Sequence, residues 1–170
     1  MKALSGDRFG SLLYRVLNPV YAREPLSGHG AALHGGRFNR KGRAALYCAL
    51  RPETALREAN QIGTLQPTVL VAYRADLRPV LDERSGSALE AYGFDVTALA
   101  APDWRSRMLA GAAVPTQDLA ERLIAAGFAD LFVPSFARGA VARDLNLVLW
   151  RWNTRADDDV TVVDDEGRLS

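Results

Sequence analysis

The residues with the greatest potential for chemistry lie in one short segment, Gly35-Gly36-Arg37-Phe38-Asn39. Paired glycines let the backbone approach a ligand closely, and a guanidinium group binds phosphate or carboxylate through two parallel hydrogen bonds. By residue type alone, the segment is more typical of a glycine turn followed by a surface arginine that pairs with a nearby carboxylate. It therefore indicates an anion site only if other parts of the chain support that interpretation.

Several common kinds of active site do not fit the residues that the chain offers. His29 and His34 are its two histidines and Cys48 its one cysteine, so we expect no zinc or iron site and no internal disulfide bond. The glycines between 28 and 36 match neither the dinucleotide-binding fingerprint nor the phosphate-binding loop. Ser135 lies between a proline and a phenylalanine, without the flanking glycines of a serine-hydrolase nucleophile.

Composition and charge predict one soluble domain. Hydrophobic residues make up 48% of the 170 residues and charged residues 24%, which provides enough apolar material for a core. The formal net charge of +1 argues against direct binding to nucleic acid, and the acidic runs at 157–159 and 164–166 predict a solvated C-terminal edge. Residues 1–7 lack the apolar stretch of a secretion signal, and no later run is long enough for a membrane span. We therefore expect a cytoplasmic protein without membrane association.

The elements that must position these residues follow no regular β-α-β order, which favours a mixed α+β fold. We expect six strands, at 12–17, 45–49, 68–73 with a continuation at 79–82 after a kink, 131–133, 145–152 and 160–163. Helices are expected from Pro52 to about Gln61 and from a cap at Thr116 or Asp118 to Gly127, with short pieces between 87 and 111. Residues 18–42 are expected to form a long functional loop.

Five short motifs, taken in chain order, resemble the RES domain family. They are Tyr14-Arg15, the loop from Gly28 to Asn39, Leu46-Tyr47, Ala55 with Glu58, and Pro134-Ser135. The resemblance covers about Leu12 to Trp152 and implies a single RES domain over 1–170 with a core at about 12–152. The family usually has tryptophan where this chain has Phe38, a conservative departure. The implied fold is α+β and ADP-ribosyltransferase-like, with mixed, mainly antiparallel β-sheets flanked by short helices.

The resemblance implies an enzyme that consumes NAD by cleaving the bond between nicotinamide and ribose. Breaking this bond builds positive charge on the ribose, which a carboxylate stabilises, and the resemblance assigns that role to Glu58. Arg37 and Arg15 would hold the negative charge of the pyrophosphate. Without the family, Glu58 is typical of a helix-surface glutamate paired with Arg51 or Arg57, and Arg15 of an edge arginine.

Two further residues match the active site of the family. Tyr47 would stack on nicotinamide, and the hydroxyl of Ser135 would hydrogen-bond nicotinamide, ribose or Glu58. Otherwise the two residues are typical of a core tyrosine and a turn serine. We assign no role to His34 and Asn39, and the apolar strand around Asn146 predicts that its side chain binds backbone.

The resemblance also implies a place in a toxin–antitoxin pair, with an Xre-like antitoxin protein as partner. The ADP-ribose could pass to water or phosphate, as in an NAD glycohydrolase or phosphorylase, or to a host protein, as in a mono-ADP-ribosyltransferase. The sequence does not choose among these acceptors, and it does not identify a protein target or the stoichiometry of the complex. The alternative is a non-catalytic module that binds a nucleotide or holds the antitoxin.

Overall fold

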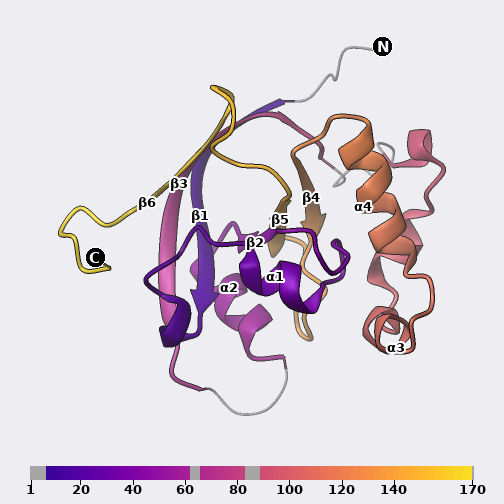
Figure 1. The fold of residues 1–170 in the computed structure, drawn as a ribbon, viewed down its shortest axis with the longest axis horizontal. Coiled ribbons are helices and arrows are strands. Elements are labelled where there is room, and N and C mark those ends of the chain that lie inside the picture. The colour runs from indigo at the N-terminus through magenta and orange to yellow at the C-terminus, as the bar shows by residue number, and fades with distance from the viewer. Residues whose placement is uncertain (1–6, 62–65, 83–88, 170) are drawn as a thin grey trace.

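Six antiparallel strands form one sheet in the order β4-β5-β2-β1-β3-β6 (Figure 1). The computed structural model describes residues 7–61, 66–82 and 89–169. The strands are β1 (Asp7–Leu17), β2 (Leu46–Ala49), β3 (Val69–Val80), β4 (Asp130–Pro134), β5 (Leu145–Leu149) and β6 (Asp158–Val162). The α-helices are α1 (His29–His34), α2 (Pro52–Ala59), α3 (Trp104–Leu109) and α4 (Pro115–Ala125). Short 3-10 turns span Pro19–Tyr21, Glu90–Tyr92 and Val96–Ala100.

This architecture confirms the predicted α+β class with a mainly antiparallel sheet and short helices. β3 runs on through Val80, as the predicted continuation requires, and its pairing with β1 shifts register between Leu77 and Val80, at the predicted kink. β5 ends at Leu149, three residues before the predicted end. The predicted loop at 18–42 contains α1 and a 3-10 turn, so it is not wholly irregular. Residues 1–6, on which part of the secretion-signal prediction rests, and 87–88 of the short helical pieces lie outside the described residues.

The predicted cap of α4 is wrong. The helix follows Val114 and has a proline in its first turn, and no side chain caps it. The hydroxyl of Thr116 instead donates to the carbonyl of Arg37 at 2.6 Å, and Asp118 forms an ion pair with Arg40. Both side chains bind the segment that carries Arg37, so neither is available to accept a hydrogen bond from the amides at the start of α4.

Alternating side chains give the sheet a core on each face. Phe132 of β4 and Leu147 of β5 belong to the cluster that β1 and β3 line, with Leu13 and Tyr73 fully buried in it. Side chains of opposite parity on β4 and β5 pack in the second cluster, against α4. Its members include Leu131, Val133, Val148, Leu119 and Leu123. Figure 1 shows α3 and α4 on the β4 side of the sheet, with β6 at the opposite edge.

The sheet is weakly joined at its centre, and the chain that follows β3 contacts β4. β1 and β2 share a single pair of residues, Tyr14 and Ala49, so the two strands diverge beyond it. Past β3 the chain reaches β4, where the amide of Phe132 donates to the carbonyl of Leu81 at 2.8 Å. An open space at the centre of the sheet follows from this divergence, and α2 begins directly after β2 beside it.

The C-terminal part of the chain belongs to the same sheet. β6 pairs with β3, and Asp158 is buried, so the prediction that residues 157–159 are all solvated is wrong for Asp158. Its carboxylate accepts hydrogen bonds from the amides of Thr154 and Arg155, both at 2.8 Å, and lies 3.3 Å from Arg151. These donors offset the cost of burying its charge. None of the helices in the described part of the chain has the length and apolarity needed to cross a membrane.

Candidate functional site

Glu58 lies near the end of α2, and its carboxylate accepts hydrogen bonds from three side chains. Ser135 donates to Oε1 at 2.5 Å and Asn146 donates to the same oxygen at 2.6 Å. Gln61, three residues along the chain, donates to Oε2. The alternative in which Glu58 pairs with Arg51 or Arg57 is wrong, because Arg51 pairs with Glu53 and Arg57 pairs with Asp144. Three donors fix the orientation of a half-buried carboxylate.

Asp144 fastens α2 to the segment that carries Ser135. Its buried carboxylate accepts from the hydroxyl of Thr54 at 2.7 Å and from Arg57 at 2.5 Å, both on α2. It also accepts from the amide of Val141 at 2.9 Å, and its carbonyl accepts from the amide of Ser135 at 2.7 Å. Hydrogen bonding from Val141 and Thr54, with the charge of Arg57, lowers the pKa of Asp144 below its ordinary value. Glu58 and Ser135 are thus held together by an ionised anchor.

Glu58 faces a cleft of about 490 Å³ and an adjoining hollow of about 220 Å³. The smaller hollow lies where β1 and β2 diverge, and Tyr14 and Cys48 line it. Burial raises the pKa of the Cys48 thiol to about 12, so this side chain is an apolar wall and not a nucleophile. Five residues line both spaces. They are Arg15, Tyr47, Glu58, Ala59 and Asn146.

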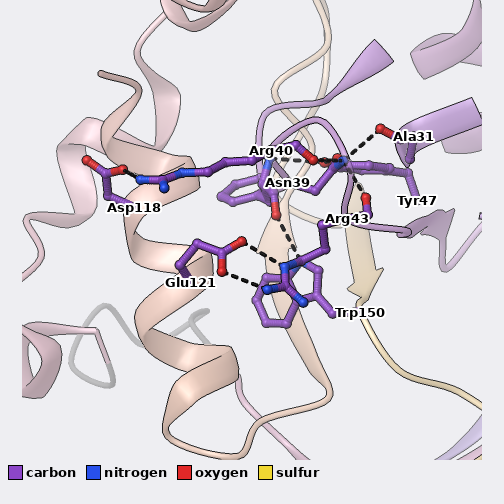
Figure 2. A network of polar contacts seen from close by, with 9 residues as sticks. Ala31, Asn39, Arg40, Arg43, Tyr47, Asp118, Glu121 and Trp150 are labelled. Carbon is purple, nitrogen blue, oxygen red and sulfur yellow. Dashed lines mark hydrogen bonds and ion pairs between the residues drawn. The ribbon is translucent and has the colours of Figure 1, made fainter. Parts of the chain in front are cut away.

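Helix α4 holds the loop that carries Arg37. Figure 2 shows the outward side of the contact, where Arg40 pairs with Asp118 and Arg43 forms a two-pronged contact with Glu121, at 2.7 and 2.8 Å. On the inner side, the side chain of Gln117 donates to the carbonyl of Gly36 at 2.8 Å. The turn that presents Arg37 is therefore attached to the rigid part of the fold.

Tyr47 and Asn39 form the inner support of this loop (Figure 2). The hydroxyl of Tyr47 donates to Asn39 Oδ1 at 2.7 Å and accepts from the amide of Phe38 at 3.0 Å. Asn39 is fully buried and donates to the carbonyls of Ala31 and Arg43, at 2.8 and 2.9 Å. Burial raises the pKa of Tyr47 far above its ordinary value, so the hydroxyl stays protonated. Tyr47 thus presents its ring to the cleft, while its hydroxyl is occupied by hydrogen bonds with Asn39 and Phe38.

Phe38 is buried beneath the loop, and the indole N–H of Trp150 donates to its carbonyl at 2.8 Å. The RES domain family, which the sequence resembles, usually has tryptophan at this position. The ring of Phe38 lies 6.4 Å from that of Phe136, centroid to centroid. The substitution therefore falls on a buried packing position that also lines the cleft.

Arg37 extends from the loop into the cleft. Its Nη1 donates to the carbonyls of Leu99 and Ala101 at 2.7 and 3.0 Å, and its guanidinium carbon lies 4.7 Å from the centre of the Phe136 ring. Burial lowers the pKa of Arg37, and the negative charge of Glu58 opposes that shift. A guanidinium nevertheless remains charged at neutral pH, so Arg37 places a fixed positive charge near Glu58.

Arg15 projects from β1 between the two spaces. Its Nη1 donates to the carbonyls of Pro25 and Ser27, at 3.3 and 3.2 Å. Tyr73 donates to the same carbonyl of Pro25 at 2.8 Å. Arg15 therefore secures the start of the long loop, and it also lines the cleft.

The RES domain family matches residues 12–170 of the chain, which is essentially its whole length. The chain belongs to the RES domain family. RES domains are generally associated with toxin–antitoxin systems and with NAD. No curated protein matches the chain. The match runs past residue 152, which agrees with the place of β6 in the sheet.

This RES domain brings four of the five predicted site residues to the wall of the cleft. Arg15, Arg37, Tyr47 and Glu58 line it, whereas Ser135 touches Glu58 without being among the residues that line either space. The prediction for Asn146 is wrong, because its side chain binds Glu58 and not backbone. Its other amide atom, Oδ1, is buried without a hydrogen-bond partner in the described part of the chain. An atom of this kind is normally satisfied by a water or a ligand.

Sequence reasoning missed several side chains of this RES domain's cleft. Gln61, Trp104, Arg105 and Phe136 all line it. Gln61 had a local signal, because a residue three positions after a helical glutamate can reach it. The others come from segments with no motif of their own. No group of three or more His, Cys, Asp or Glu side chains in the described residues is arranged to hold a metal ion.

Proposed function

We propose that this RES domain is an NAD-consuming toxin that cleaves the bond between nicotinamide and ribose. The observation that carries the proposal is the carboxylate of Glu58, held by three donors at the wall of a cleft that it shares with Arg37. A carboxylate oriented in this way can stabilise a positive charge that develops beside it. The association of the family with NAD supports the choice of substrate.

In the proposed reaction the C1′–N bond breaks and its electron pair leaves with nicotinamide, which becomes neutral. The ribose carbon becomes oxocarbenium-like, and Glu58 stabilises that charge without forming a bond. An acceptor then attacks C1′ and loses a proton to solvent. The acceptor is water or phosphate for a glycohydrolase or phosphorylase, and a nucleophile of a host protein for a mono-ADP-ribosyltransferase.

The other predicted residues have separate roles in the proposal. Arg37 and Arg15 bind the negatively charged phosphates, with the free parts of their guanidinium groups, and the ring of Tyr47 packs against nicotinamide. Ser135 acts through Glu58, since it donates to Oε1 and orients the carboxylate. It is therefore a positioning residue in this proposal, although direct contact with the substrate remains a prediction.

A toxin of this kind needs a restraint in its own cell, because loss of NAD harms the host. We propose an Xre-like antitoxin as the partner, with a segment that blocks the cleft beside Arg37 and Glu58. Neither direct contact with nucleic acid nor contact with a membrane is part of the proposal.

The deciding experiment measures release of nicotinamide from NAD by the purified protein. Glu58→Gln keeps the size of the side chain but removes its charge, and turnover should fall by about 10²–10⁴-fold. Affinity for NAD should change far less, because the ground state carries little of the positive charge on ribose.

Glu53→Gln is the matched control, since Glu53 lies on the same helix, is exposed and pairs with Arg51. This variant should keep its turnover. If the wild-type protein releases no nicotinamide, even with phosphate and protein acceptors present, the enzymatic proposal fails and a non-catalytic binding module takes its place. Near-normal turnover by Glu58→Gln would remove Glu58 from its assigned role.

A further inference from the structure

One wall of the cleft carries none of the residues that the sequence singled out. It is formed by α3, whose first two residues, Trp104 and Arg105, line the cleft together with Arg37 and Phe136. Trp104 is half-buried and Arg105 is exposed. Glu58 and Asn146 also line this cleft, so α3 and the candidate catalytic carboxylate share one space.

Arg37 connects the loop from Gly28 to Asn39, here called the glycine loop, to the segment that leads into α3. The two carbonyls that accept from its Nη1, those of Leu99 and Ala101, lie a few residues before Trp104. The guanidinium carbon of Arg37 lies 5.7 Å from the centre of the Trp104 ring, and that of Arg105 lies 5.1 Å from the same ring. Trp104 therefore has two guanidinium groups around it.

The charges of these two arginines are not neutralised by direct ion pairs. Neither Arg37 nor Arg105 forms an ion pair with a carboxylate in the described ranges 7–61, 66–82 and 89–169. Burial lowers the pKa of Arg37 and the negative charge of Glu58 opposes that shift, while the positive charge of Arg105 makes a smaller contribution in the lowering direction. By contrast Arg107, on the same helix, pairs with Asp103 at 2.6 Å.

Two like charges that face one cleft without a carboxylate partner form a favourable place for an anion. Guanidinium groups bind phosphate oxygens with paired hydrogen bonds, and an indole wall excludes water from one side of such contacts. A diphosphate matches this arrangement better than a single phosphate does, because it offers separate oxygens to each of two arginines.

We propose that Trp104 and Arg105 complete the subsite for the diphosphate of a dinucleotide, in which Arg105 binds its oxygens together with Arg37 and Arg15 beside the indole. This inference rests on the proposed function. It extends that function by stating which part of the dinucleotide binds at each end of the cleft. The diphosphate lies at α3, and the nicotinamide riboside end lies at Glu58.

The test compares Arg105→Gln with Arg107→Gln in the purified full-length chain. The two changes remove the same charge from the same helix, but Arg107 does not line the cleft. Arg105→Gln should raise KM for NAD about tenfold, as expected for loss of one charge-assisted hydrogen bond, with a smaller change in kcat. Arg107→Gln should leave KM unchanged. Nicotinamide mononucleotide, which has the same scissile bond but no diphosphate, should be cleaved equally by wild type and Arg105→Gln.

A binding measurement separates this inference from the proposed function. ADP carries the diphosphate without the scissile bond, and its Kd is measured by calorimetry for the wild type and both variants. The inference expects about tenfold weaker binding for Arg105→Gln alone. Equal ADP affinity in all three proteins, or no ADP binding by the wild type, overturns the inference whether or not NAD is cleaved. If NAD is not cleaved but ADP binding still depends on Arg105, the subsite stands and the proposed activity fails.

Discussion

Gly36 sits so close to its neighbours that the loop has no room for a side chain there. A Cβ atom at this position would lie 2.5 Å from the hydroxyl oxygen of Tyr47 and 2.6 Å from Oδ1 of Asn39. These are the atoms that support the loop from inside, and Asn39 is fully buried. The glycine is thus required by the close approach of Tyr47, and the adjacent Arg37 takes its position from the same packing.

Gly36→Ala should therefore destabilise the protein and disturb the cleft. We expect a loss of about 1–3 kcal/mol in the free energy of unfolding, because Tyr47 or the loop must move to accommodate the methyl group. Urea titration measures this loss, and nicotinamide release should fall with it. Gly30→Ala is the matched control for stability, since a Cβ there meets no atom within 4 Å. It lies inside α1 and should be neutral or slightly stabilising. Equal stability of the two variants would contradict this account of Gly36.

At the scale of elements, the junction of β3 with β4 contains a buried carboxyl group. Asp130 opens β4, is 1% exposed, and accepts a hydrogen bond from the amide of Leu81 at 3.3 Å. Burial raises its pKa from the ordinary 3.8 to about 7, against the opposing effects of this hydrogen bond and of Arg151. The folded protein therefore favours the neutral form of Asp130 below this pKa.

This pKa predicts a stability loss as pH rises. Below pH 4 Asp130 is protonated in both states, whereas between about 4 and 7 the unfolded chain releases the proton and the folded chain retains it. Stability from this group therefore falls across that window and levels off above it, by about 4 kcal/mol at most for a pKa shift of this size.

Asp130→Asn cannot ionise, and its Oδ1 can still accept from Leu81. The Tm of this variant relative to wild type should rise between pH 5 and pH 8, as thermal unfolding at the two pH values would show. An identical difference in Tm at both values would mean that the carboxyl group does not titrate in this way.

At the scale of the whole molecule, the cleft depends on how distant segments meet. β1 and β2 share one residue pair at the centre of the sheet, and the space beyond it is closed by α2, the glycine loop and α3. The carboxylate of Glu58 is half-buried and lines this space, where a protein segment could cover it. An inhibitor that fills the cleft would block every proposed acceptor at once.

On the proposed function, expression of the chain alone should arrest bacterial growth. Glu58→Gln should relieve the arrest at equal protein level, since the harm comes from turnover. An Xre-like antitoxin expressed with the wild-type chain should protect the cells and co-purify with it, and growth curves with affinity co-purification measure both effects. Harmless expression of active, folded enzyme without any partner would contradict the toxin role and leave the NAD chemistry in place.

Much of the fold and part of the site followed from local patterns. The run of β-forming residues at 68–73 and the proline that opens α2 are properties of neighbouring residues, and the predicted positions of these elements agree with the structure. Arg15, Arg37, Tyr47 and Glu58 could be selected because each stands in a motif whose order along the chain resembles a family. Loop boundaries and the cap of α4 could not be predicted, because distant partners compete for the same polar side chains.

The sequence by itself determined the α+β class, the family and the candidates for chemistry. The resemblance offered Glu58 as one of three partners for Ser135, and only the tertiary structure decided that Ser135 and Asn146, 77 and 88 residues from Glu58, donate to its carboxylate. It also decided that Asp158 is buried and that Arg105 shares a cleft with Arg37. Such contacts join side chains that are far apart in the sequence and follow no regular spacing. The strand order and the divergence of β1 and β2 determine which side chains meet. Local propensity and hydrophobic alternation act over a few residues, so they carry no information about these long-range contacts.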